Sequence, residues 1–183
     1  MEYMILQIPG IDGETKLEGF DGNQADNNDG FGAGIEIMSY SWNVNNPVQA
    51  SPSNVGRTTG RPNFGELVVT KKLDSTSPIL ADDCASAKNE GKVVLSLVRQ
   101  DEQAGENLVY MVYELYNTLI SSVSVGGSGD VPIETLSLNY SQINWIYSEQ
   151  SEDMGDEEGS SGGATAARGW DLGLNKEAEN VGQ

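Results

Sequence analysis

Residues 133–147 read Ile133-Glu-Thr-Leu-Ser-Leu-Asn-Tyr-Ser-Gln-Ile-Asn-Trp-Ile-Tyr147. Apolar and polar side chains alternate along this stretch, the pattern of a β-strand that buries one face. Apolar residues occupy even-numbered positions over residues 136–140 and odd-numbered positions over residues 143–147. Because a shift of one residue moves every later side chain to the opposite face, we expect a bulge near Ser141 or Gln142.

A second stretch of the chain shows the same switch. Ile35 and Ile37 are apolar at odd positions, whereas Tyr40, Trp42 and Val44 are apolar at even positions. We therefore expect each of these two strands to bend and to pass from one side of a closed barrel to another.

The rest of the chain carries mainly strand signals. Runs rich in β-branched and aromatic residues are separated by short Gly, Asn, Asp or Ser segments, which is typical of an antiparallel barrel or sandwich. We predict a mainly β fold, a small antiparallel β-barrel of two packed, curved sheets, in a single domain spanning residues 1–183. The further runs are Tyr3–Ile8, Phe64–Lys71, Val93–Arg99, Leu108–Leu115 and Leu119–Val125.

One α-helix is expected to flank this barrel. Ser77 can cap the helix, Pro78 suits its first position, and Lys88 falls near its end. The residues expected on its buried face are Leu80, Cys84 and Ala87. Cys84 should therefore be a packed thiol rather than a reactive one.

The run Leu108–Leu115 is apolar on both of its faces, with Tyr110 on one and Tyr113 on the other. One face can fill the barrel, while the other needs cover from a helix or from a neighbouring subunit. Helix signals are few, so we favour the neighbour and expect Tyr110 and Tyr113 at a subunit interface.

Charge and composition exclude several classes of protein. The chain of 183 residues has 28 acidic and 10 basic residues, a net charge of −18, which disfavours nucleic acid and anionic membranes as partners. The first residues form only a short apolar run after an acidic start, so we expect neither a cleavable signal peptide nor membrane insertion. A lone cysteine suits a cytoplasmic protein.

The sequence lacks the combinations of residues that form common catalytic sites. It contains no histidine, so Cys84 lacks the usual base, and no carboxylate pair is singled out for hydrolysis. The Gly-rich segment 125–130 lacks the lysine and the helix of a phosphate site. We predict a protein that is not an enzyme and has no cofactor or metal.

A calcium-dependent binding module built on oxygen ligands between Asp21 and Asp29 is an alternative, but their spacing misses the EF-hand pattern.

Several unusual segments occur between about residue 3 and about residue 176, and their sequences and their order resemble those of one known family. They are Ser39-Tyr-Ser-Trp42, Gly56-Arg-Thr-Thr-Gly-Arg-Pro-Asn-Phe64, Thr70-Lys-Lys-Leu-Asp-Ser-Thr-Ser-Pro78, Ser121-Ser-Val-Ser-Val-Gly-Gly-Ser-Gly129, Glu134-Thr-Leu-Ser-Leu-Asn-Tyr140 and Gly169-Trp-Asp171. The family that they resemble is the haemolysin-coregulated protein (Hcp) family of type VI secretion systems.

The resemblance implies a β-barrel subunit that assembles into a hexameric ring, and rings that stack into a tube. It further implies that the tube forms in the cytoplasm inside a contractile sheath, carries a valine-glycine-repeat spike protein, and is secreted without a cleavable signal peptide. Effector proteins would travel in the lumen of the ring.

Particular residues match family positions with expected roles. Residues 45–63 match a protruding loop that stacks rings, and its expected contacts are Pro47, Val48, Arg57 and Arg61; an ordinary long surface loop is the alternative. Ser128 and Ser41 match positions near the channel wall and are expected to contact cargo; ordinary turn and strand serines are the alternative.

The chain also departs from the family pattern. Residues 12–34 are expected to form an acidic loop and residues 148–167 a solvated acidic segment, and both carry parts that are longer or more charged than in the family. A tail-tube subunit of a phage-like or other contractile injection system shares the same architecture and is the nearest rival.

Overall fold

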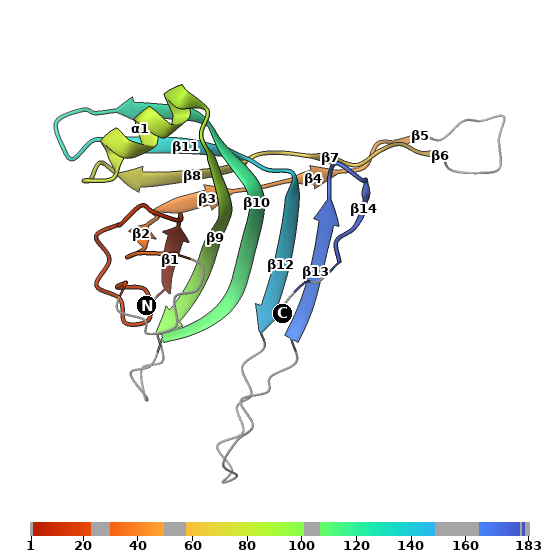
Figure 1. The fold of residues 1–183 in the computed structure, drawn as a ribbon, viewed down its shortest axis with the longest axis horizontal. Helices are drawn as coiled ribbons and strands as arrows, with labels where there is room; N and C mark the ends of the chain where they lie inside the picture. The colour runs from red at the N-terminus through yellow and green to blue at the C-terminus, as the bar shows by residue number, and fades with distance from the viewer. Residues whose placement is uncertain are drawn as a thin grey trace, which may run out of the picture.

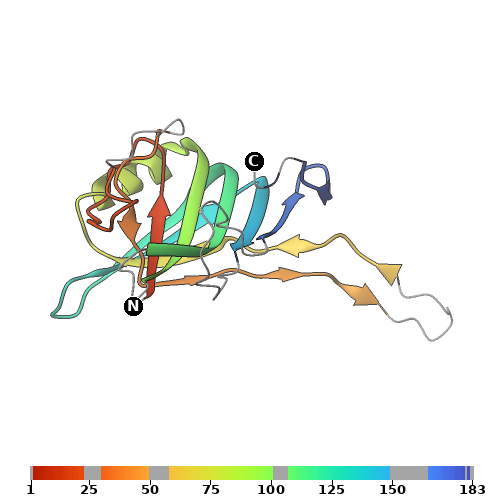
Figure 2. The same ribbon diagram turned by 90° about the horizontal axis from the view of Figure 1, so that it is seen from below.

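A computed structural model describes residues 2–22, 30–49, 58–100, 107–148, 165–179 and 181 (Figure 1). Within these residues the fold is mainly β with one short helix, as predicted. Antiparallel strands curl into a barrel, and a long hairpin projects from it (Figure 2). The strands of the barrel are β1 (Glu2–Gln7), β2 (Ile35–Glu36), β3 (Ser39–Ser41), β8 (Leu67–Lys72), β9 (Asn89–Gln100), β10 (Asn107–Gly126) and β11 (Ile133–Asn139).

The barrel closes at the segment that joins β2 to β3. Strand β2 pairs with β1, and β3 pairs with β8. Between them, the amide of Ile37 donates to Met4 O at 2.8 Å and the amide of Met38 donates to Thr70 O at 2.7 Å. One short stretch of chain thus bonds to both sides of the barrel, which confirms the bend expected from the phase change after Ile37.

The long strand β10 holds the rest of the sheet together. One edge pairs with β9, and the other pairs first with β12 (Gln142–Ser148) and then with β11. The predicted irregularity is the break between β11 and β12, where the Ser141 amide donates to Tyr116 O at 3.0 Å. Opposite it, Asn117 has a φ of 51° and donates through Nδ2 to Ser141 Oγ at 2.8 Å. Strand β10 and the run from β11 into β12 both bend here, so the barrel turns a corner.

Two extensions leave the barrel on the same side (Figure 1). Strand β12 continues into β13 (Thr165–Asp171) and β14 (Lys176–Glu177). Beside them runs the projecting hairpin, which we define as residues 43–64. Its strands are β4 (Val44–Asn45), β5 (Val48–Gln49), β6 (Thr58–Thr59) and β7 (Asn63–Phe64), paired as β4 with β7 and β5 with β6.

The helix α1 (Ser77–Ser86) covers one end of the barrel, as predicted, but its capping differs from the prediction. Thr76 occupies the N-cap position, and the Ser77 hydroxyl points into the interior instead. Leu80 is buried and Cys84 packs against the core, as expected, whereas Ala87 is exposed. Ala87 ends the helix in the left-handed conformation, with φ at 51°, so its side chain does not continue the buried face.

A buried ion cluster ties the helix to the barrel. Lys71 on β8 is completely buried, and its Nζ lies 2.9 Å from Glu134 Oε2 and 2.8 Å from Asp74 Oδ1. The Ser77 hydroxyl, which is 3.1 Å from the same Nζ, donates to Glu134 Oε2 at 2.8 Å. Burial by itself would raise the pKa of Asp74, but hydrogen bonds from Lys71 and Thr76 outweigh it and lower that pKa.

Part of the predicted acidic loop is packed rather than solvated. Leu17 and Phe20 lie against Ile5 and Val98 on the outside of the barrel, and Asn107 Nδ2 donates to Glu18 O at 3.1 Å. Aromatic burial outweighs the surrounding polarity at this point. Residues 23–29, which hold most of the calcium-ligand candidates, and residues 149–164 of the second acidic segment lie outside the described residues.

Candidate functional site

Four neighbouring strands present one face of the barrel wall to the outside. Their order is β3, β8, β11 and β10, and their inward side chains form the core. On strand β8, for example, Leu67 and Val69 are buried, whereas Val68 and Thr70 alternate with them and point away from the core. The outward positions of these four strands therefore define a single surface.

The pairing register brings serine and threonine residues into two rows across this surface. One row runs Ser41, Val68, Ser137 and Ser122, and the other runs Ser39, Thr70, Thr135 and Ser124. We call these two rows the hydroxyl face. Ser39 Oγ lies 2.5 Å from Thr70 Oγ1, so two hydroxyls of the second row interact across neighbouring strands.

The two rows contain no charged residue, in a chain that carries a net charge of −18. The next row begins with Lys72, which pairs with Ile133 and marks the margin of the face. Each hydroxyl can donate one hydrogen bond and accept two, so the face can bind polar groups without preferring either sign of charge.

Of the two serines expected at a channel wall, the structure places one on the hydroxyl face. Ser41 lies in its first row, opposite Val68. Ser128 instead lies in the loop between β10 and β11, where it is exposed. The sequence alone could not reveal the rows, because the register joins positions that are far apart along the chain.

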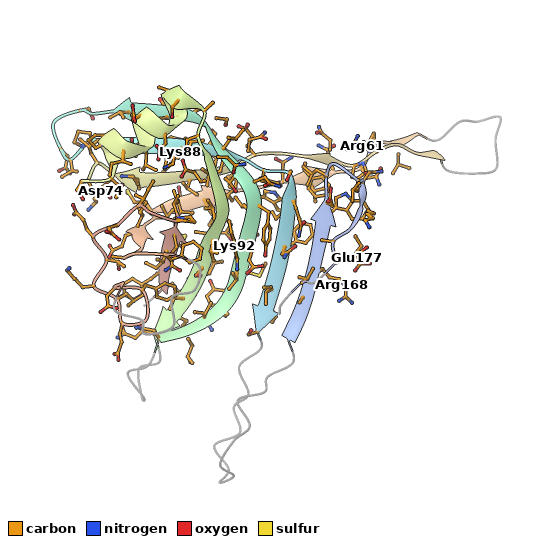
Figure 3. All side chains as sticks on the ribbon, viewed as in Figure 1. Arg61, Asp74, Lys88, Lys92, Arg168 and Glu177 are labelled. Carbon is orange, nitrogen blue, oxygen red and sulfur yellow. The ribbon has the colours of Figure 1, made fainter. Side chains whose placement is uncertain are left out.

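The projecting hairpin contains the residues predicted to stack rings. Pro47 and Val48 are exposed, and Pro47 O accepts a hydrogen bond from the Gly60 amide at 3.0 Å. Arg61 lies near the base of the hairpin, where its guanidinium donates to Leu172 O (Figure 3). Arg57 lies outside the described residues.

A bulge changes the expected orientation of the two tyrosines on β10. The register with β9 shifts between Val109 and Met111, so Tyr110 and Tyr113 both pack against the core instead of lying on opposite faces. Tyr113 lies 5.6 Å from Tyr40 between ring centroids. Burial and the Tyr40 hydroxyl raise the pKa of Tyr113, so this phenol stays neutral. Both tyrosines are half-buried, and a subunit contact through their exposed edges remains a prediction.

The parts of the chain that the structure describes bring no three His, Cys, Asp or Glu side chains together in a way that would hold a metal ion. None of their helices is long and apolar enough to cross a membrane.

Residues 6–147 match a family model described as "Type VI secretion system effector, Hcp". Protein hcp1 of Pseudomonas aeruginosa is 34% identical over 119 residues, which cover 63% of this chain and 68% of that protein. The crystal structure of Hcp1 from Salmonella typhimurium has a TM-score of 0.70 at 26% identity and covers 97% of this chain and 99% of that one. A structure of a type six secretion system protein reaches a TM-score of 0.79 at 22% identity, over 97% of this chain and 100% of that one, which supports the fold.

Proposed function

The chain belongs to the Hcp family of type VI secretion tube proteins, and from this membership we propose that its copies close into hexameric rings that stack into a secreted tube. The observation that carries the proposal is the family match over residues 6–147. The role is structural, with no catalytic step. A closed ring needs contacts between two different surfaces of the subunit, and the edges of Tyr110 and Tyr113 are candidates for one of them.

The hydroxyl face is the surface that best suits the channel wall of such a ring. Six subunits with 18 negative charges each sum to 108, so a wall that carried its share of acidic residues would repel acidic cargo and hold basic cargo firmly. An uncharged wall of hydroxyls would let effector proteins of either charge bind weakly and leave. Ser41 would contact such cargo.

Stacking is assigned to the projecting hairpin. The hairpin extends away from the barrel (Figure 2), and Val48 on its outer strand β5 offers an exposed apolar contact. Prolines limit the conformations of the chain around Pro47, so less entropy is lost when the hairpin docks. Arg57 would meet acidic surface on the next ring.

The remaining partners follow from the same assembly. A contractile sheath would surround the tube, a valine-glycine-repeat spike protein would sit at its tip, and effectors would ride inside. The subunit would fold and assemble in the cytoplasm and then be secreted.

Ring formation is tested by negative-stain electron microscopy together with the solution mass from light scattering, across a salt series. We expect rings of six with an open channel, and a larger assembled fraction at 0.15 M than at 0.01 M salt, because the Debye length falls from about 30 Å to about 8 Å and repulsion between the acidic subunits is screened. A monomer at every salt concentration would contradict the proposal. An assembled fraction that does not change with salt would contradict only the electrostatic part.

The position of Ser41 is tested by thiol labelling in a Cys84→Ser background. In tubes, we expect Ser41→Cys to react with a small maleimide but at least tenfold more slowly with a maleimide attached to a large protein, which cannot enter the channel. Leu174→Cys is the matched control on an exposed part of the C-terminal segment and should react with both reagents. Equal rates for the two reagents at Ser41→Cys would place the hydroxyl face outside the channel. Ser128→Cys tests the other predicted serine in the same way.

A further inference from the structure

Three charged side chains meet where helix α1 ends and strand β9 begins. They are Asp83 in the last turn of the helix, Lys88 in the connection and Glu90 on β9. Lys88 Nζ lies 2.8 Å from Asp83 Oδ2 and 3.2 Å from Glu90 Oε2, so one cation serves two carboxylates (Figure 3). We call these three residues the junction cluster. None of them belongs to the hydroxyl face or to the projecting hairpin.

The two acids of the junction cluster are buried, whereas its cation is not. The exposed fraction of the side chain is 8% for Asp83 and 1% for Glu90, against 48% for Lys88. Glu90 Oε1 accepts no hydrogen bond from the described residues. A buried carboxylate is costly to keep ionised when it is incompletely hydrogen-bonded, because its charge has lost the water that would solvate it. The fold therefore stabilises the charge of Glu90 poorly.

The groups around Glu90 favour its neutral form. Burial is the largest influence and raises the pKa of Glu90; Lys88 opposes the rise, and Asp83 adds to it. Lys88 is held mainly by Asp83, whose hydrogen bond raises the pKa of the lysine. Strand β10 pairs with β9 at this point and places the buried, uncharged Thr118 opposite Gly91. The charges that act on Glu90 are thus Asp83 from the helix and Lys88 from the connection.

We propose that Glu90 and Asp83 form a proton-binding pair that fastens the end of helix α1 to the barrel at mildly acidic pH and loosens it at alkaline pH. In the acidic form, protonated Glu90 donates a hydrogen bond to the Asp83 carboxylate, which is within reach, and Lys88 stays with Asp83. In the alkaline form, two buried negative charges face each other and share one half-exposed lysine. The inference goes beyond the proposed tube and does not depend on ring formation.

Protonation of Glu90 should stabilise the folded protein. An acid whose pKa is higher in the folded than in the unfolded protein makes the folded state bind more protons, so stability falls as the pH rises from the ordinary pKa of 4.5 through the raised value. The sign is opposite to that of Asp74, whose pKa is lowered in the folded protein.

Glu90→Gln tests the proposal, because glutamine has nearly the shape of a protonated glutamate and carries no charge at any pH. Urea midpoints are measured at one salt and one protein concentration. At pH 8 the midpoint of Glu90→Gln should lie about 0.5 M or more above that of the wild type, and at pH 4 the two should coincide. Glu177→Gln is the matched control, because the Glu177 side chain is 69% exposed, and it should match the wild type at both pH values. A Glu90→Gln midpoint below the wild type at pH 8, or shifted equally at both pH values, would overturn the proposal.

Lys88→Met separates proton binding from a merely structural role. Loss of the one cation in the junction cluster should raise the pKa of Glu90 further, so the fall in the urea midpoint should continue to a higher pH than in the wild type. A midpoint lowered by the same amount at every pH would contradict the proposal.

The proton itself is followed by carbon-13 NMR of the glutamate carboxyl groups. In the wild type, one carboxyl should titrate above 4.5, and its signal should be missing from Glu90→Gln. The measurement also decides the case in which Glu90→Gln does not fold. A raised titration that moves higher still in Lys88→Met supports the proposal, and glutamates that all titrate at or below 4.5 overturn it.

Cys84 reports the loosening of the helix, because it is the only cysteine of the chain and follows Asp83 on α1. Its rate of reaction with a pyridyl disulfide is divided by the rate for the same protein unfolded in urea at the same pH. This ratio should rise from pH 5 to pH 8 in the wild type and stay level in Glu90→Gln. A ratio that stays level in both proteins would overturn the loosening.

Discussion

Replacing Lys71 by methionine should destabilise the subunit by about 3–5 kcal/mol, the usual effect of removing one partner of a buried ion pair. The substitution nearly preserves the volume of the side chain but removes the charge that faces Glu134 and Asp74. Glu134 is 1% exposed, so water cannot replace the lost partner. Urea unfolding at pH 7 measures the effect.

Two comparisons show whether the ion cluster is responsible for the loss of stability in Lys71→Met. Lys72→Met changes the neighbouring exposed lysine and should alter stability by less than about 0.5 kcal/mol. Lys71→Met combined with Glu134→Leu removes both buried charges and should recover much of the loss. A double variant no more stable than Lys71→Met would mean that packing, rather than an uncompensated charge, explains the effect.

The pH dependence of the Lys71→Met effect has a definite sign. The pKa of Asp74 is lowered in the folded protein, so its contribution is present above the ordinary pKa of 3.8 and is lost as the pH falls through the lowered value. The difference in stability between wild type and Lys71→Met should therefore narrow below pH 3.8.

Removing the outer part of the projecting hairpin should abolish tubes and leave rings. Asn45 and Asn63 are paired across β4 and β7, so an Asn-Gly pair can replace residues 46–62 as a tight two-residue turn. Val44 stays paired with Phe64, and the core is untouched, so stability should change by less than about 1 kcal/mol.

The result is measured by counting tubes and rings in micrographs and by urea unfolding of the same protein. Tubes should fall at least tenfold, while the solution mass still corresponds to rings. Tubes that persist at the wild-type level would show that stacking does not depend on the hairpin. Loss of rings as well would assign the hairpin to contacts within the ring.

Much of the barrel could be predicted because burial of one face leaves a period of two in the sequence. The phase changes near Ile37 and Ser141 were readable for the same reason, and both became corners of the barrel. The bulge at β10 was missed because Leu108–Leu115 is apolar at almost every position. Apolar and polar residues do not alternate there, so the sequence does not show which side chains face inward. The short length of β2 and β3 is set by their pairing with strands that are distant in the sequence. The local pattern of apolar and polar residues does not encode that pairing.

The buried ion cluster was also missed, although the sequence held a signal for it. Lys71 has the same parity as Leu67 and Val69, and Glu134 has the same parity as Leu136 and Leu138. A lysine and a glutamate at inward positions of two strands are a candidate pair. Their partnership still depends on β8 lying beside β11, which only the fold reveals.

The short segment that closes the barrel has a consequence for the order of folding during synthesis. Strand β1 needs β9, and β8 needs β11, so the joint at Ile37 and Met38 cannot be completed until the ribosome has released residues beyond Asn139. Until then β1 and β8 present unpaired edges, which are prone to pair with other chains. Most of the contacts are between distant residues, so folding should be slow and largely post-translational. A nascent chain stalled before β11 should be cut readily by protease, and one that extends past β12 should resist.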